Sequence, residues 1–303
     1  LHTCRECRAD SECTSGVCNE LNGECANTVL HVDSDPANTP SDSNDCLSPA
    51  TPCLTVAGAM AKPVSGTRYI AVHAADVEYL GAGEIAVTGS ASVYVKGIPD
   101  PAQPDYVATL DRSGNGPILS VDGSSASLTI VGVTLSGASG TDGDGVECSN
   151  VARLTVLDTI LSNNAHYGIN AAGCNLIIDR AIIRDNNRGG GHVDGDFSIT
   201  NTFIHGNVGT SSFGGLEVDL DPSDVFAHNT IYRNTANTGV PGGLRCIGTG
   251  TARHNIIYGS LGTIVEYNLV GGCSHEYSLI GTTVEVGAGN ISAATVDEIH
   301  FAN

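Results

Sequence analysis

Apolar and polar residues alternate along the middle of the chain in short runs that recur at a near-constant spacing. In four successive copies the run ends at an asparagine: Asn164, Asn186, Asn207 and Asn234. Strict alternation over a few residues is typical of short strands with one buried face. A repeat period of about 20–50 residues is typical of solenoids. The pattern therefore predicts coils of short strands stacked on one another.

Equivalent positions in successive coils are expected to stack along the axis. One set forms an apolar row: Leu135, Leu161, Ile183, Ile204, Ile231 and Ile257. The four asparagines form a second row, in which each side-chain amide bonds the next, as in the amide ladders of stacked strands. We therefore predict an all-β fold, a right-handed parallel β-helix with a structural asparagine ladder.

The rest of the chain divides around this repeat. We expect a disulfide-rich N-terminal segment at residues 1–27, a lead-in at 28–68, the β-helix at 69–283 and a C-terminal tail at 284–303. The lead-in holds a predicted strand at 29–32, an acidic loop and a short helix at 55–61, with Thr55 as its N-cap. This helix is expected to cap the first coil, which otherwise exposes its apolar rows and strand edges.

The charge of the chain limits its partners. A net charge of −20 argues against nucleic acid and anionic membranes. No run of 18 apolar residues is present, so no membrane insertion is expected. The sequence begins at Leu1 without a methionine or signal peptide, which we interpret as a processed mature form.

The eleven cysteines indicate an oxidising compartment. We expect Cys46 and Cys53 to close a small loop. Two further pairs lie one repeat period apart and are expected to join neighbouring coils: Cys148 with Cys174, and Cys246 with Cys273. Five cysteines fall in the N-terminal segment, so one pairs elsewhere, pairs with another chain, or has lost a partner. The Cys4-Arg-Glu-Cys7 spacing also suits zinc or a redox dithiol, although structural disulfides fit this setting better.

The lead-in carries a resemblance to a known group of proteins. Its motifs are Val32-Asp-Ser-Asp, Ser43-Asn-Asp-Cys46, Thr51-Pro-Cys-Leu-Thr-Val56 and Gly66-Thr-Arg-Tyr-Ile70. They resemble the start of secreted β-helix proteins of the pectate-lyase-like superfamily. More narrowly, the chain resembles surface-exposed proteins with a Cys-rich prefix found in myxobacteria and their relatives. The resemblance implies secretion, or a place on the extracellular face of a bacterial cell envelope, and it is specific for fold and not for activity.

A short strand is predicted after each glycine-rich connection, with its middle residue pointing outward. These middle residues should form one exposed row: Glu147, Asn170, His192, Glu217, Arg245 and Glu266. We predict Glu147, Asn170 and Glu266 as substrate contacts. Neighbouring rungs lie about 4.8 Å apart, which brings Glu217 next to both His192 and Arg245.

Two residues further along these strands, Asp194 and Asp219 are also expected to be neighbours. Like charges directly opposite each other are destabilising unless something compensates them. Calcium, held by Asp194, Asp219, Asp221 and Glu217, is one compensation, because hard oxygen ligands suit that ion. The alternative is an acidic face that is simply solvated.

The resemblance implies a mechanism of the pectate-lyase-like enzymes, in which the polysaccharide lies along such a sheet. Calcium neutralises the carboxylate of the uronate unit, and a basic residue takes the proton beside that carboxylate. Here Arg245 or His192 is the candidate base, with Glu217 beside them. The chain departs from those enzymes, because their set of calcium-binding Asp and Arg residues is not recognisable as a motif. Gly191-His192-Val-Asp194 also differs from the Gly-His-Gly of polygalacturonases.

Three functions remain open at this point. The first is binding of an extracellular polysaccharide or other surface glycan, with or without lyase chemistry. The second is a non-catalytic adhesin whose solenoid is a stiff spacer. The third is self-association into filaments by coils stacking end to end. Whether the protein is an enzyme stays undecided, because fold resemblance alone does not establish activity.

Overall fold

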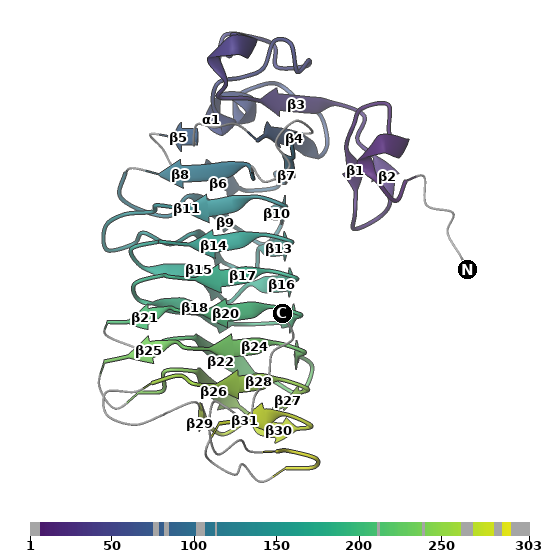
Figure 1. Ribbon diagram of the computed structural model, residues 1–303. Helices are drawn as coiled ribbons and strands as arrows, with labels where there is room; N and C mark the ends of the chain where they lie inside the picture. The colour runs from purple at the N-terminus through teal and green to yellow at the C-terminus, as the bar shows by residue number, and fades with distance from the viewer. Residues whose placement is uncertain are drawn as a thin grey trace, which may run out of the picture.

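Parallel strands form three long sheets that wind around one axis in the computed structural model (Figure 1). The structure describes residues 7–74, 79–81, 85–100, 107–112, 114–210, 213–237, 240–261, 269–281 and 287–291. Sheet 1 contains ten strands in this order: β3 Val29–Val32, β4 Arg68–His73, β7 Ser92–Ile98, β10 Ser127–Val131, β13 Arg153–Leu157, β16 Asn175–Asp179, β19 Phe197–Thr200, β23 Val225–Ala227, β27 Thr251–Arg253 and β30 Ser274–Glu276.

The other two long sheets take one strand from each coil in the same way. Sheet 2 contains β5 Tyr79–Gly81, β8 Thr109–Arg112, β11 Thr134–Ser136, β14 Ile160–Ser162, β17 Ile182–Arg184, β20 Phe203–His205, β24 Thr230–Tyr232, β28 Ile256–Tyr258 and β31 Leu279–Ile280. Sheet 3 contains β6 Ile85–Thr88, β9 Leu119–Asp122, β12 Val146–Ser149, β15 Tyr167–Ala172, β18 Gly189–Asp194, β22 Leu216–Leu220, β26 Leu244–Gly248 and β29 Leu269–Gly271. Each strand pairs with its counterpart in the next coil, so the molecule is a parallel β-helix, as the alternation predicted.

The remaining elements are short. Two small sheets pair β1 Cys18–Asn19 with β2 Glu24–Cys25, and β21 Val208–Gly209 with β25 Thr235–Ala236. The helices among the described residues are η1 Asp10–Glu12, η2 Pro36–Asn38 and α1 Val56–Met60. Across the described ranges, no helix has the length and apolar character that a membrane span requires.

The interior of the coils is a continuous aliphatic core. The predicted row of Leu135, Leu161, Ile183, Ile204, Ile231 and Ile257 is paired in register and fully buried. Thr55 caps α1 by accepting a hydrogen bond from the Gly58 amide at 2.9 Å. Val56 and Ala59 of α1 pack into the same core, so the helix covers the interior at the N-terminal end.

The asparagine ladder holds one corner of four successive coils. The Asn164 amide donates to Asn186 Oδ1 at 3.0 Å, Asn186 donates to Asn207 at 2.9 Å, and Asn207 donates to Asn234 at 2.9 Å. All four side chains are fully buried. A residue with positive φ precedes each of them, for example Asp185 at 56° before Asn186. This left-handed residue turns the chain, and the asparagine then satisfies buried backbone groups that the corner leaves unpaired.

A second ladder, which the sequence analysis missed, holds the corner between sheets 1 and 2. The backbone amide of Thr202 donates to Asn229 Oδ1 at 3.0 Å, and the backbone amide of Asn229 donates to Asn255 Oδ1 at 2.9 Å. The backbone amide of Asn255 then donates to Ser278 Oγ at 3.1 Å. Asn229, Asn255 and Ser278 lie one repeat period apart in the sequence, and this spacing could have revealed the second ladder.

The N-terminal segment packs against the outer face of sheet 1, beside its first strands (Figure 1). Val17 and Ala26 of the segment bury the outward-facing Tyr94 and Val131. Lys96, on the same face, forms ion pairs of 2.9 Å with both Asp10 and Glu20. Alternation alone places these sheet residues in solvent, so their burial could not be predicted without the segment that covers them.

Disulfides join cysteines in the N-terminal segment, in the lead-in and in the β-helix. Within the N-terminal segment the pairs are Cys7–Cys18 and Cys13–Cys25. The remaining pairs are the three expected from the sequence: Cys46–Cys53, Cys148–Cys174 and Cys246–Cys273. Cys4, the fifth N-terminal cysteine, lies outside the described residues.

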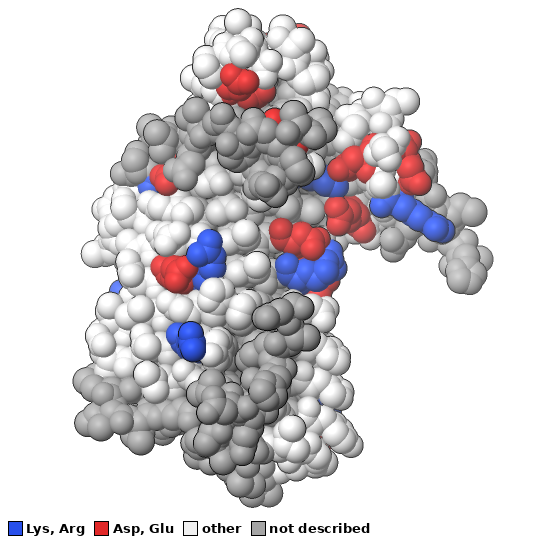
Figure 2. Space-filling view, viewed as in Figure 1, with Lys and Arg blue, Asp and Glu red and all other residues white. Residues whose placement is uncertain are grey.

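Charged side chains on the outside of the coils are often grouped with opposite charges. Figure 2 shows blue and red groups in contact at several places on one face, separated by uncharged surface. Arg180 pairs with Asp158 at 2.6 Å, and Arg184 pairs with Asp185 at 2.7 Å. Exposed pairs of this kind contribute little stability each, about 0–1 kcal/mol.

Candidate functional site

Sheet 3 aligns five of the six predicted outward residues on adjacent coils. The paired residues are Glu147 with Asn170, Asn170 with His192, His192 with Glu217, and Glu217 with Arg245. Their flanking residues, such as Val146, Ile169 and Leu216, are fully buried. The alternation of buried apolar residues with outward polar ones therefore builds one polar row on the outer face of sheet 3. We call these five residues the polar row.

Glu217 is the centre of the charge pairing in the polar row. Its Oε1 lies 3.3 Å from His192 Nε2, and its Oε2 pairs with Arg245 Nη1. The Glu217 side chain is only 13% exposed, whereas Arg245 is 44% exposed. The hydrogen bond with Glu217 raises the pKa of His192, and the same hydrogen bond, with Arg245 adding to it, lowers the pKa of Glu217. The carboxylate is therefore compensated by Arg245, and also by His192 when its imidazole is protonated.

A buried carboxylate extends the polar row at its N-terminal side. Asp144 is 2% exposed and accepts hydrogen bonds from His166 Nδ1, from the Tyr167 amide at 2.9 Å and from Asn170 Nδ2 at 3.0 Å. A carboxylate bonded to one imidazole nitrogen fixes the orientation of the ring. Asp144 thereby orients both His166 and Asn170. His166 was not predicted as a site residue, although it lies one coil after Asp144 in the sequence.

The sixth predicted member of the polar row was wrong. A strand was expected at 265–267 with Glu266 outward, but the strand opposite β26 is β29, Leu269–Gly271, and it places Val270 opposite Arg245. Glu266 itself lies outside the described residues. In two coils the outward residue comes six positions after the corner asparagine, as in Asn164 to Asn170 and Asn186 to His192. The same interval, counted from Ser260, gave Glu266. In this coil the connection is longer, so the register shifts.

The predicted calcium ligands lie at the other end of the same strands. Val193 pairs with Val218, so Asp194 and Asp219 occupy the next positions, and both are exposed. Asp221 follows in the turn, where its backbone amide donates to Asp224 at 2.7 Å. Among the described residues, three candidate ligand atoms within 4.8 Å of one another occur only at Cys7, Cys13 and Cys18, whose sulfurs are in disulfides. Calcium binding at the carboxylates stays a prediction.

Two disulfides lie on the core side of the strands that carry the polar row. Cys148 of β12 is bonded to Cys174, and Cys246 of β26 to Cys273, with Cα–Cα distances of 5.9 and 5.7 Å. Cys148 and Cys246 point into the core and are fully buried. Each bond fixes one coil to the next, which stiffens the sheet that carries the polar row.

Comparison with known proteins identifies the family. Residues 117–284 match the family described as the right-handed β-helix region. The search of curated proteins gave no match. Among solved structures, the crystal structure of the pectate lyase Pel9A is similar over 90% of this chain and 78% of that chain, with 12% identity and a TM-score of 0.41. At that TM-score, nothing about activity follows from the likeness. The family match covers more than half of the 303 residues, and the chain therefore belongs to the right-handed β-helix family.

Proposed function

We propose that this protein binds an extracellular polysaccharide laid along sheet 3, across the coils. The observation that carries the proposal is the polar row itself. Five hydrogen-bonding side chains stand in register on five adjacent strands, about 4.8 Å apart, on one flat face. A linear chain of repeating hydroxyl groups matches such a periodic set of donors and acceptors. The five disulfides fit a protein of the extracellular space, and we propose secretion or a cell-surface location.

Lyase chemistry is a finer proposal for the same face. It requires a base, and Arg245 and His192 are the candidates in the polar row. Glu217 pairs with both, and it favours the protonated form of His192. To act as a base, either residue therefore has to leave Glu217 and lose a proton of its own before it accepts one from the substrate. Binding without cleavage makes no such demand, so we put binding first.

A non-catalytic stiff spacer is the second candidate. The observation that favours it is the pairing of Glu217 with Arg245 and His192, which satisfies the central charge of the polar row without any ligand. In that case the polar row only keeps the face soluble and in register.

Native gel electrophoresis with polysaccharide cast into the gel separates the candidates. Polygalacturonate, alginate and xylan serve as probes, with ultraviolet absorbance reporting unsaturated products. Glycan binding predicts retardation of the wild type by at least one probe and its loss in His192→Ala/Arg245→Ala. The matched control is Arg180→Ala. Arg180 lies at the corner between sheets 1 and 2, where it pairs with Asp158, so this variant removes a positive charge outside the polar row. Equal retardation of both variants would assign binding to another surface, and no retardation by any probe would favour the spacer.

A further inference from the structure

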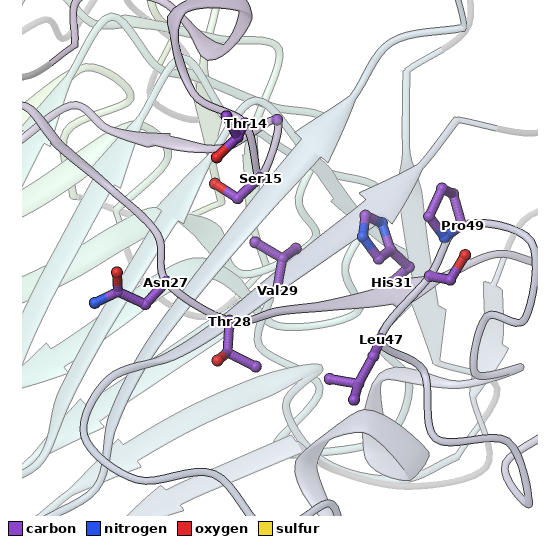
Figure 3. A pocket seen from close by; sticks show the side chains of 10 residues that line it. Thr14, Ser15, Asn27, Thr28, Val29, His31, Leu47 and Pro49 are labelled. Atoms are coloured by element: carbon purple, nitrogen blue, oxygen red, sulfur yellow. The ribbon is translucent and has the colours of Figure 1, made fainter.

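A cavity of about 610 Å³ lies where the N-terminal segment meets the lead-in (Figure 3). Its walls come from three separate stretches of chain, and none of them belongs to sheet 3. The lining residues are Thr14, Ser15, Gly16, Asn27, Thr28, Val29, His31, Leu47, Ser48 and Pro49. The volume falls within the range of about 300–1,000 Å³ that small-molecule sites occupy. Figure 3 shows Thr14 and Ser15 on one side of the cavity and Val29 and His31, from β3, on the other.

Disulfides hold two of the three walls in place. The Cys7–Cys18 and Cys13–Cys25 bonds fix the turn that carries Thr14, and the Cys46–Cys53 bond closes the loop that carries Leu47. The third wall belongs to β3, which pairs with β4 along its whole length. A cavity built from constrained segments loses little conformational entropy on binding, which favours affinity.

The cavity contrasts in charge with the rest of the protein. The chain carries a net charge of −20, yet the ten lining residues include no Asp, Glu, Lys or Arg. His31 is the single titratable lining residue. Burial, and next the neighbouring His73, lower its pKa to about 4, so its ring is neutral at neutral pH. His31 Nδ1 lies 3.0 Å from His73 Nε2, which orients the ring. A charged ligand would find no counter-charge in this cavity.

The lining combines short polar side chains with a few apolar ones. Hydroxyls come from Thr14, Ser15, Thr28 and Ser48, an amide from Asn27, and apolar surface from Val29, Leu47 and Pro49. Leu47 is 56% exposed, at the side of the cavity that the Cys46–Cys53 loop forms. A hydrocarbon ligand would leave the hydroxyl groups of the lining without hydrogen-bond partners, and an ionic ligand would find no side chain of opposite charge there. A sugar ring offers hydroxyls around its edge and C–H groups on its faces, and so matches both kinds of surface.

We infer that this cavity binds a neutral saccharide unit, separately from the polar row on sheet 3. The unit is either a free sugar or a residue of a longer neutral glycan. The inference does not depend on the proposed polysaccharide site, since the two sites share no residue and lie on different sheets. It makes the N-terminal segment a second carbohydrate-binding element.

Saturation-transfer NMR on the full chain tests this inference. The probes are cellobiose, maltose and N,N′-diacetylchitobiose, with glucuronic acid as the charged counterpart and neutral xylan as the polymeric source. We expect at least one neutral probe to receive saturation and glucuronic acid to receive none. Binding of the disaccharide assigns a free sugar or chain end, and binding of xylan alone assigns a unit within a longer glycan.

Thr14→Trp tests the location, because Thr14 is exposed in the turn at the cavity and a large ring there fills the space. The expected loss of affinity is at least tenfold. Thr51→Trp is the matched control, since Thr51 is exposed on the Cys46–Cys53 loop but does not line the cavity. Asn27→Ala removes an amide without filling the cavity, and we expect about tenfold weaker binding, with the thermal transition unchanged.

Three results would overturn the inference. They are saturation of no neutral probe, equal affinity in Thr14→Trp and Thr51→Trp, and loss of the disaccharide signal in His192→Ala/Arg245→Ala. The last result would assign the sugar to the polar row. Conversely, a failed polysaccharide assay with an intact, Thr14-dependent sugar signal would leave this cavity as the binding site and reject the proposed function.

Discussion

Glu217 is the residue on which the electrostatics of the polar row depend. Its position next to His192 and Arg245 was predicted from the strand alternation and the spacing of neighbouring rungs, and the register of sheet 3 agrees. The sequence could not show that one carboxylate pairs with both cations, because that depends on side-chain conformation. Nor did it indicate how far the carboxylate is buried, since the conformations of the neighbouring side chains determine its exposure.

The Glu217–His192 contact predicts a pH-dependent cost for Glu217→Gln. The pKa of His192 is raised in the folded state, so the contact adds stability below about pH 6.5 that is lost as pH rises through the folded-state pKa. Denaturant unfolding should therefore show a larger cost of Glu217→Gln at about pH 5.5 than at about pH 9, because only the protonated imidazole interacts strongly with the carboxylate. Loss of the Arg245 pairing contributes equally at both values.

The His192→Ala background is the control for this effect. There, Glu217→Gln should cost the same at both pH values, because no imidazole remains to titrate. An identical cost at both pH values in the wild-type background would mean that His192 does not interact with Glu217 in solution.

Asp194 and Asp219 give the second prediction at this scale. If the two exposed carboxylates share calcium, the ion raises the melting temperature, since a ligand bound only by the folded state stabilises it. At a hundredfold excess over the dissociation constant the gain is about 2.7 kcal/mol. Thermal unfolding with calcium and with chelator should differ in the wild type and in Asp142→Asn. The difference should disappear in Asp194→Asn/Asp219→Asn.

Chelator that leaves the transition unchanged would assign these carboxylates to a solvated acidic face. Glu217 is the weakest of the predicted ligands, because His192 and Arg245 already compensate its charge.

At the scale of the elements, the strand and corner of each coil were the most predictable features. The period of the alternation and the repeated asparagine determine which residues stack, so the row from Leu135 to Ile257 and the ladder from Asn164 to Asn234 followed from spacing alone. The Glu266 position failed because loop length is not constrained by the stacking, and a longer connection moved the strand to β29.

The ladder predicts a large cost for Asn186→Ala. The buried side chain accepts hydrogen bonds from the backbone and side-chain amides of Asn164, and it donates to the Leu161 carbonyl at 3.1 Å. Its removal leaves several buried polar groups unpaired, at about 1–3 kcal/mol each, so we expect a loss of about 3 kcal/mol or more in the free energy of unfolding. Urea unfolding measures this loss.

Asn187→Ala is the matched control, because the neighbouring side chain is exposed. It should change the free energy of unfolding by less than about 0.5 kcal/mol. Similar costs for the two substitutions would mean that the ladder does not stabilise the corner.

At the scale of the whole molecule, the sequence predicted the solenoid and its capping helix but not how the N-terminal segment is attached. Tyr94, Val131 and Lys96 stand at outward positions, where alternation predicts solvent exposure. They are covered because Val17, Ala26, Asp10 and Glu20 lie against them. Contacts between a repeat and a segment outside it have no periodicity, so no pattern in the sequence reveals them. The cavity at this junction was missed for the same reason.

The dependence of affinity on oligosaccharide length tests the central claim most directly. The polar row spans four strand spacings, about 19 Å. Calorimetric titration with a series of oligosaccharides of the retained polysaccharide should show affinity rising with each added unit until the chain spans the polar row, and then a plateau. Thr14→Trp should give the same curve, and Arg245→Ala should reach its plateau at a shorter chain. Affinity that is independent of chain length, or a length dependence unchanged by Arg245→Ala, would contradict binding along sheet 3.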